Sequence, residues 1–330
     1  MVVQKTLDDF FKIHNNKEAL NFVSFIVRTE YLPILAELQR IKREIFSDIK
    51  KANLMHSKES NTIKVSLPGY DVYLENLMYS NTPISNAAKM NVNDKESLNR
   101  FRKAIAQANE NIFKSLLRFN KEIPTHLYFG VLIKAAKVGD QNAINALREL
   151  QENGLIQIEL WENIDTRNID TDKLINEAKH TSVVQEKIDL YAGGRYALEY
   201  ISELLKSYIM LWRELNKKKD EIFSTLREFN LIDPGKSIKV TTNYGAVYIG
   251  AYEIIRYEKI NEEEIKDTLL KYGFRKEEFT ALDLTTIMRN ERYSWLRKKL
   301  EEEKYISPTP EERIYIRNIF KEAKRNERVF

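Results

Sequence analysis

The hydrophobic pattern of the chain predicts long amphipathic helices that alternate with short pairs of strands. Two charged helices with apolar residues at helical spacing end at Asn53-Leu54 and at Asn230-Leu231. Each is followed by two β-rich runs joined by a glycine-containing turn, at Pro68-Gly69 and at Asn243-Tyr244-Gly245. We therefore expect a fold that is mainly α with small β-hairpins, an α+β arrangement.

The two helix–hairpin segments also resemble each other in sequence, which indicates an internal duplication. Residues 44–47 and 221–224 share the tetrapeptide Glu-Ile-Phe-Ser. The strands that follow share Ile-Lys-Val at 63–65 and 238–240, and Val-Tyr at 72–73 and 247–248. We expect two related halves, each opening with a long helix that leads into a hairpin. The alternative is chance similarity between helices rich in lysine and glutamate.

Each half then carries a second helical block of the kind found in winged-helix domains. In the first block, residues 127–132 and about 141–153 have the pattern of two amphipathic helices, and Gly154 precedes an alternating strand at 157–161. An amphipathic helix, a glycine stop and an alternating strand are the order in which a recognition helix leads into a wing. Residues 279–288 and 292–306 repeat the theme in the second half, so tandem winged-helix-like domains are expected.

These blocks contain the side chains through which recognition helices bind DNA. Arg, Asn and Gln near the N-terminal end of such a helix meet base edges, while Lys and Arg contact phosphates. The candidate DNA-binding residues are Gln141, Asn142, Asn145, Arg148, Arg289, Asn290, Arg292, Arg297 and Lys298. The second block is the more basic one. The alternatives are a solvated basic helix face and a winged helix that docks on protein.

The N-terminal segment matches the pattern Q-x-x-(aliphatic)-x-x-aromatic-aromatic at Gln4, Leu7, Phe10 and Phe11. It resembles the PIP box, the peptide by which replication and repair proteins bind the PCNA sliding clamp. One helical turn places the leucine and both phenylalanines on one face, where they can fill a hydrophobic pocket. The alternative is a first helix whose apolar residues dock on the protein's own core.

Composition narrows the possible functions. Lys and Arg total 53 against 49 Asp and Glu, so the net charge is only +4 and DNA contacts must come from local basic patches. The chain has no cysteine, which excludes disulfides, Cys-ligated zinc and iron–sulfur clusters. The lysine- and glutamate-rich composition fits a thermophile. No uninterrupted apolar run reaches the ~18–20 residues of a membrane span, so a cytoplasmic, nucleoid-associated protein without a membrane partner is expected.

A search for catalytic motifs finds none. Glycine is too scarce for a Walker-type loop, and the four histidines have no nearby partners for a metal or a general base. We therefore expect no catalytic residue, no metal and no cofactor. The alternative is a clamp-recruited repair or replication nuclease built from dispersed Asp and Glu, because such sites leave weak marks in a sequence.

The expected domain organisation has four parts. Residues 1–14 form the clamp-binding peptide, 15–165 the first half, 166–190 a linker, and 191–330 the second half. The linker is inferred from a polar stretch that includes Asp170 and Asp172.

A clamp-binding peptide followed by duplicated winged-helix blocks resembles the archaeal winged-helix initiator protein (WhiP), described as a distant relative of the eukaryotic replication licensing factor. That licensing factor also has an N-terminal PIP box, which Gln4, Leu7, Phe10 and Phe11 match here. Its paired winged helices correspond in kind to residues 127–161 and 279–306. The resemblance implies binding to origin double-stranded DNA and contact with the replication machinery, such as helicase or polymerase, without enzymatic activity. A clamp–polymerase or clamp–helicase adaptor is the remaining alternative.

Replacing both phenylalanines, Phe10→Ala with Phe11→Ala, should abolish binding to PCNA because the apolar groups that fill its pocket are lost. The melting temperature of the protein should not change. Calorimetric titration with the clamp and thermal melting measure the two quantities. If the double substitution lowers the free energy of unfolding by several kcal/mol, the two side chains belong to the core and the clamp interpretation fails.

Overall fold

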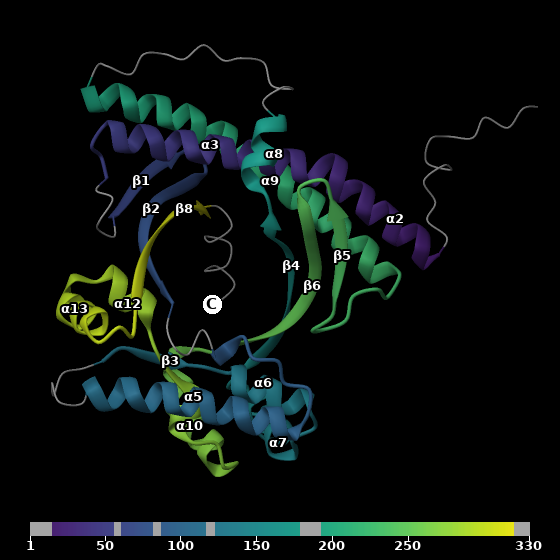
Figure 1. Cartoon of the computed structure of the whole chain (residues 1–330), viewed down its shortest axis with the longest axis vertical. Helices are drawn as coiled ribbons and strands as arrows, with labels where there is room; N and C mark the ends of the chain where they lie inside the picture. The colour runs from purple at the N-terminus through teal and green to yellow at the C-terminus, as the bar shows by residue number, and fades with distance from the viewer. Residues whose placement is uncertain (1–14, 56–60, 82–86, 117–122, 179–192, 320–330) are drawn as a thin grey trace, which may run out of the picture.

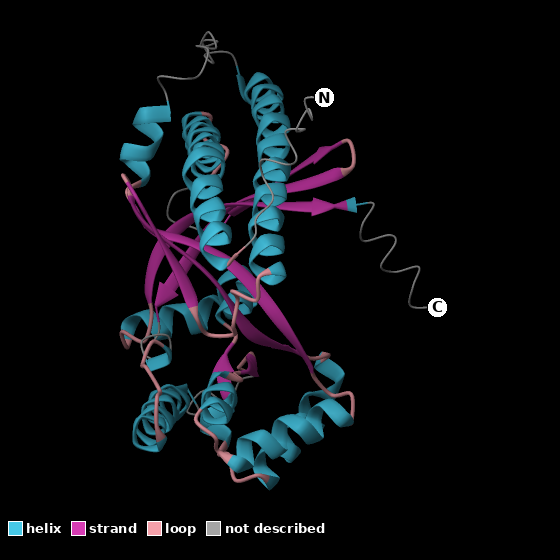
Figure 2. Cartoon of the chain, turned by 90° about the vertical axis from the view of Figure 1, so that its right-hand side faces the viewer, coloured by secondary structure: helices cyan, strands magenta, loops and turns pink. Residues whose placement is uncertain are grey.

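The computed structural model describes residues 15–55, 61–81, 87–116, 123–178 and 193–319. Its elements form a frame (Figure 1), with long helices on one side, two sheets descending from them and a second group of helices on the opposite side. Figure 2 shows the same three levels from the side, with the strands between the two groups of helices. At 59% helix and 23% strand, with small antiparallel sheets, the α+β fold class is confirmed.

The long helices are α2 (Asn16–Ile26), a π-helical turn (Val27–Tyr31), α3 (Leu32–Lys51) and α9 (Gly193–Glu228). The first three form one continuous helix, which begins where the Asn15 side chain accepts the N–H of Glu18. Pro33 has no N–H to donate, and the departure from α-helical geometry lies just before it. α9 packs against both α2 and α3, and α8 (Thr171–Ala178) packs against α3.

The described residues form three antiparallel sheets, of which the two three-stranded ones connect the two sides of the frame. The first sheet has the order β1 (Asn61–Leu67), β2 (Tyr70–Asn81), β8 (Ser307–Asn318). The second has the order β4 (Gln157–Ile169), β6 (Gly245–Arg256), β5 (Ser237–Thr242). A two-stranded sheet pairs β3 (Thr125–Leu127) with β7 (Thr280–Leu282).

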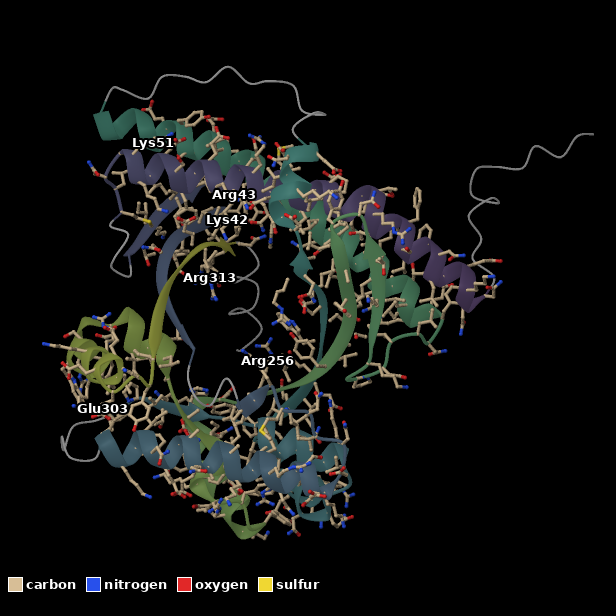
Figure 3. The ribbon with its side chains drawn as sticks, in the orientation of Figure 1. Lys42, Arg43, Lys51, Arg256, Glu303 and Arg313 are labelled. Atoms are coloured by element: carbon tan, nitrogen blue, oxygen red, sulfur yellow. The ribbon has the colours of Figure 1, made fainter. Side chains whose placement is uncertain are left out.

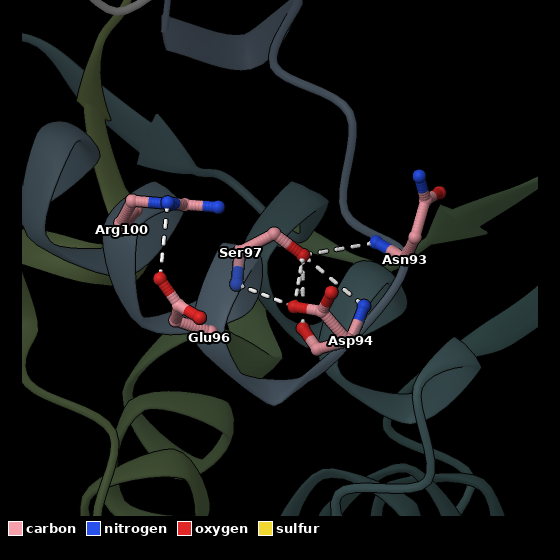
Figure 4. A network of polar contacts seen from close by, with 5 residues as sticks. All are labelled: Asn93, Asp94, Glu96, Ser97 and Arg100. Atoms are coloured by element: carbon pink, nitrogen blue, oxygen red, sulfur yellow. Dashed lines mark hydrogen bonds and ion pairs between the residues drawn. The ribbon is translucent and has the colours of Figure 1, made fainter.

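The second group of helices shares one hydrophobic core that draws residues from both halves of the chain. Its helices are α5 (Lys95–Leu116), α6 (Gly130–Lys137), α7 (Gln141–Glu152), α10 (Glu262–Lys271), α11 (Lys276–Phe279), α12 (Leu284–Arg289) and α13 (Ser294–Glu302), with 3-10 turns at Lys259–Asn261 and Glu291–Tyr293. α5 begins at a cap in which Asp94 and Ser97 bond to each other's side chains and backbone (Figure 4). Arg102 of α5 holds the buried Glu278 of α11 through two bonds of 2.9 Å, which ties the halves together.

The order of elements occurs twice along the chain. A long helix, a hairpin, a helix, a short strand, two helices and a long strand run from α3 to β4 and again from α9 to β8, with α11 as an addition in the second run. Asn53 and Asn230, which end the long helices, both have φ of +51°. The residue after each of them donates its N–H to the helix, Leu54 to Ile49 and Leu231 to Leu226.

The shared tetrapeptide has the same environment in both places. Ile45 and Phe46 are buried in the core between α3, α9 and the first sheet. Ile222 and Phe223 are buried in the core between α2, α9 and the second sheet. The serine that follows is exposed in both cases. The Ile-Phe pair therefore recurs because each long helix packs on the core face of a hairpin.

The strands of the two halves are interleaved, and here the structure differs from the expected organisation. β8 pairs with β2, β4 pairs with β6, and β3 pairs with β7, so each long strand completes the sheet of the other half. Residues 166–178 of the expected linker are the end of β4 and helix α8. Leu174 and Ile175 of α8 are buried, and the polar residues between them and Ile169 obscured this apolar spacing in the sequence.

One helix in the described ranges, Asn16–Lys51, is long and apolar enough to cross a membrane by length and composition. Polar residues interrupt its apolar stretches, so the search of the sequence for an uninterrupted apolar run did not identify this helix. Core helices of soluble proteins have the same composition. This helix contributes Val23, Ile26 and Leu32 to one core and Ile41 and Ile49 to another, so internal packing accounts for these apolar residues.

The ends of α7 and α13 also match. Leu150 accepts the N–H groups of Leu155 and Ile156 at 2.9 and 3.3 Å, and Leu300 accepts those of Tyr305 and Ile306 at the same distances. The residue that turns the chain is Gly154 with φ of +67° after α7, and Lys304 with φ of +58° after α13. A side chain costs about 1 kcal/mol in this left-handed region, which glycine adopts freely.

The substitution Lys304→Gly should therefore stabilise the protein by about 1 kcal/mol, and Gly154→Ala should destabilise it by a similar amount. Nothing lies within 4 Å of a methyl group placed on Gly154, so the effect there comes from the backbone. Urea unfolding of both variants measures the free energies. If Lys304→Gly lowers the free energy of unfolding, the contacts of the lysine side chain stabilise the protein by more than the left-handed backbone destabilises it.

Candidate nucleic-acid interface

The structure places part of the predicted site. The clamp-binding residues Gln4, Leu7, Phe10 and Phe11 lie outside the described residues, as does the side chain of Arg289. On α7, Gln141, Asn142 and Arg148 are exposed and Asn145 is half-buried. On the second block, Asn290, Arg292 and Lys298 are exposed and Arg297 is half-buried.

The α7 residues are organised by local hydrogen bonds. Asp140 caps the helix by accepting the N–H of Ala143 at 3.0 Å, which fixes the start of the first turn. Gln141 donates its amide N–H to the Asn145 carbonyl oxygen at 3.0 Å. Both amides can hydrogen-bond adenine, and their mutual bond would have to open for that. One arginine, Arg148, supplies the positive charge on this helix face.

The α13 residues form a more basic surface. Tyr293, Leu296 and Leu300 point into the core, which leaves Arg292 and Lys298 in solvent. The opposite end of the helix is acidic, with Glu301, Glu302 and Glu303. The Asn290 side chain accepts the N–H of Arg292 at 3.0 Å and orders the turn that leads into the helix.

The charge order on α13 follows helix stability only in part, because its last turn holds both Lys299 and two glutamates. Acidic residues stabilise the N-terminal end of a helix and basic residues its C-terminal end, each by about 0.3–1 kcal/mol. α10 follows this preference, with Glu262, Glu263 and Glu264 in its first turn. α13 has no acidic residue in its first turn, and Glu301 and Glu302 lie in its last one. The other basic residues of the helix, Arg297 and Lys298, lie in its middle, where the helix dipole has little effect.

The structure does not bring the two predicted helices together. α13 lies beside α12 near the first sheet, and α7 lies near the foot of the second sheet (Figure 1). Each is followed directly by a long strand, β8 or β4, that runs from the second group of helices toward α3 and α9.

A second feature was not predicted: the face of the first sheet that points away from its core. Register places Tyr73 of β2 between Lys64 of β1 and Tyr315 of β8. The Tyr73 and Tyr315 ring centroids are 5.9 Å apart, and Tyr315 is 55% exposed. We call this the first inner face, and its members are Lys64, Asp71, Tyr73, Glu75, Arg313, Tyr315 and Arg317.

The second sheet has a corresponding surface. Tyr248 of β6 lies between Lys239 of β5 and Asp165 of β4, in the register that Tyr73 has in the first sheet. Trp161 and Tyr252 face each other across the strands and are 44% and 43% exposed. We call this the second inner face, and its members are Glu159, Trp161, Asp165, Lys239, Tyr248, Tyr252 and Arg256.

Both inner faces border the middle of the frame. Figure 3 shows Arg313 extending from β8 into this region, with Arg256 at the lower end of the second sheet. Of the four aromatic residues that are strongly exposed in the described ranges, three belong to the inner faces, and Phe25 on α2 is the fourth. The opposite faces of both sheets are apolar and packed on the long helices.

Two basic residues of the inner faces, Lys64 and Arg256, are paired with carboxylates. Lys64 bonds to Asp71 at 2.7 Å, which raises the pKa of the lysine and lowers that of the aspartate. Arg256 bonds to Glu159 at 2.5 Å. The Lys64 and Arg256 side chains are about half exposed, and exposed pairs of this kind contribute only ~0–1 kcal/mol. A phosphate could therefore replace these carboxylates at little cost.

A signal for the first inner face was present in the sequence. Residues 313–317 read Arg-Ile-Tyr-Ile-Arg, a strict alternation of polar or aromatic with aliphatic residues. This alternation predicts a strand with one aliphatic face, and the structure forms β8 there. The sequence interpretation stopped at the turn after α13, so it missed this strand and its exposed face.

The described residues offer no metal centre, because no group of three His, Asp or Glu side chains lies where it could hold an ion. His126 is exposed on β3, and the other histidines lie outside the described ranges. No family model, curated protein or solved structure matches the chain. The interpretation of its surfaces therefore depends on the chain's own residues.

The substitution Lys298→Gln should weaken binding to duplex DNA several-fold, to a similar extent for every sequence. It should also reduce the slope of log K against log salt by about 1, because one phosphate contact is lost. Fluorescence anisotropy over a series of salt concentrations measures both. Lys206→Gln is the matched control, since Lys206 is exposed on α9, far from α13 in the chain, and is paired with Glu203 of the same helix. An equal loss in both variants would contradict a specific role for α13.

Proposed function

We propose that the chain is a non-catalytic DNA-binding replication factor that residues 4–11 tether to the PCNA sliding clamp. The observation that carries the DNA-binding part is the basic surface of α13 and of the turn before it, on which Arg292 and Lys298 are exposed to solvent. The tether depends on Gln4, Leu7, Phe10 and Phe11 alone. A cytoplasmic, nucleoid-associated protein that contacts the replicative helicase or polymerase fits this role, and an origin-binding initiator is its most specific form.

The proposal includes two winged-helix-like units that arose by duplication. In each, a helix, a short strand, two helices and a long strand follow in the order of a winged helix, from α5 to β4 and from α10 to β8. α7 and α13 occupy the position of the recognition helix. The departure from an ordinary winged helix is that the strand beside each wing strand comes from the other half, β6 for β4 and β2 for β8.

The two units differ in their surface chemistry. α13 has the positive charge that phosphate contacts require, whereas α7 presents neutral amides bonded to each other. This difference favours DNA at α13, and it supports one alternative function: an adaptor that holds a polymerase or helicase at the clamp through α7. For the nuclease alternative, no observation among the described residues provides support.

One experiment separates these functions. The full chain is mixed with labelled duplex DNA that carries loaded PCNA, with and without Mg²⁺, over a range of salt concentrations. The proposal predicts salt-sensitive binding, retention by the clamp that the Phe10→Ala, Phe11→Ala variant loses, and intact DNA at the end. Clamp binding without any salt-sensitive DNA binding would favour the adaptor. Degradation that needs Mg²⁺ and that a single Asp or Glu substitution removes would overturn the proposal.

A further inference from the structure

We infer that the two inner faces bind single-stranded nucleic acid, with bases stacked on Tyr315, Tyr252 and Trp161 and phosphates held by the arginine and lysine residues beside them. This deepens the proposed function, because it shares nucleic acid as the ligand. It depends on different residues from those of α13.

Exposure of the aromatic rings is the first observation. About half of the surface of Tyr315, Tyr252 and Trp161 is in solvent. Each lies within a regular strand, at a position where a polar side chain would expose less apolar surface to water. Tyr315 lies against Tyr73, and Trp161 lies opposite Tyr252, so the rings occur in cross-strand pairs. Aromatic residues on an open sheet surface are the platforms on which unpaired bases stack.

The placement of positive charge is the second observation. The first inner face carries three basic side chains, Lys64, Arg313 and Arg317, against the two acidic ones Asp71 and Glu75. On the second, Lys239 lies opposite Tyr248, and Arg256, which is paired with Glu159, lies on the same face as Tyr252. Cations beside stacking rings are what a strand with alternating bases and phosphates requires.

The match between the two sheets is the third observation. Lys64 is opposite Tyr73 in the first hairpin, and Lys239 is opposite Tyr248 in the second. These residues point away from the cores, so packing does not explain why both hairpins have the same Lys–Tyr pair. The expected duplication accounts for the origin of the shared pair, and a shared ligand would account for its retention on both exposed faces.

Single strands fit these faces better than the other candidates. In duplex DNA the flat surfaces of the bases are covered by their neighbours, so exposed rings gain nothing from them. The core of a protein–protein interface is depleted in charged residues, whereas the rings here alternate with charged groups along and across the strands. Among the charged members named above, the first inner face has one more basic than acidic side chain and the second has equal numbers, which suits a ligand held by stacking more than one held by phosphates alone.

The test measures binding of labelled oligothymidylate and of labelled duplex to the full chain. Tyr315→Ala and Tyr252→Ala should each weaken oligothymidylate binding about tenfold, since one stacked base is lost, and should leave duplex binding unchanged. Tyr315→Phe keeps the ring and should retain most of the affinity. Phe25→Ala is the matched control, because Phe25 is 56% exposed but lies on α2, and it should change neither affinity.

Tryptophan fluorescence gives an independent measurement. Oligothymidylate should quench the emission of the protein, and Trp161→Phe should remove most of this quenching while Trp212 and Trp295 remain.

The outcomes distinguish this inference from the proposed function. If Lys298→Gln weakens duplex binding while the tyrosine variants leave oligothymidylate binding unchanged, the inference is wrong and the proposed function stands. If duplex does not bind but oligothymidylate binding depends on Tyr315 and Tyr252, the single-strand inference stands and the proposed binding of duplex DNA is wrong. An equal loss in Phe25→Ala, or an equal loss in Tyr315→Phe and Tyr315→Ala, would also overturn the inference.

Discussion

The pairing of strands between the two halves is the interaction on which the rest of the structure depends. β8 pairs with β2 along its whole length, from Ser307 to Asn318, and β4 pairs with β6 from Gln157 to Ile169. Without these partners each hairpin would be a two-stranded ribbon, which is marginally stable in water. The pairing also covers the free edges of β2 and β6. The unpaired backbone groups of such edges would otherwise attract strands of other chains.

This pairing has a direct consequence for the surfaces. Because β8 follows α13 after a single turn, the basic helix and the first inner face lie on one continuous segment, residues 294–318. α7 and β4 have the same relationship to the second inner face. Each sheet needs a strand from the other half, and that strand directly follows a candidate recognition helix. The proposed helix contact to duplex DNA and the proposed sheet contact to single strands therefore follow each other along the chain.

Much of the local structure could be predicted from the sequence. The long helices, the hairpins and the matching helix ends follow from apolar spacing, and the Glu-Ile-Phe-Ser repeat identified equivalent helices. The pairing of strands could not be predicted, because alternation at residues 313–317 shows that a strand has two different faces but not which strand lies beside it. The linker was misjudged because Asp170 and Asp172 surround a short helix whose two buried residues, Leu174 and Ile175, give too brief a pattern.

The same reasoning explains why the candidate site was found only in part. Amide residues on a helix that ends at a glycine, and basic residues clustered at 289–298, stand out in a sequence, so α7 and α13 were selected. The inner faces are assembled from β1, β2 and β8, or from β4, β5 and β6, which are up to about 250 residues apart in the chain. Their character appears only when register brings Lys64, Tyr73 and Tyr315 into one row.

The most direct test of this account is photocrosslinking of the full chain to single-stranded DNA that carries a photoreactive uracil base, followed by mass spectrometry of the linked peptides. The account predicts crosslinks to Tyr315 on β8 and to Tyr252 or Trp161 on the second sheet, because the bases would lie against these rings. Crosslinks confined to the outer helices, with none on β4, β6 or β8, would contradict it.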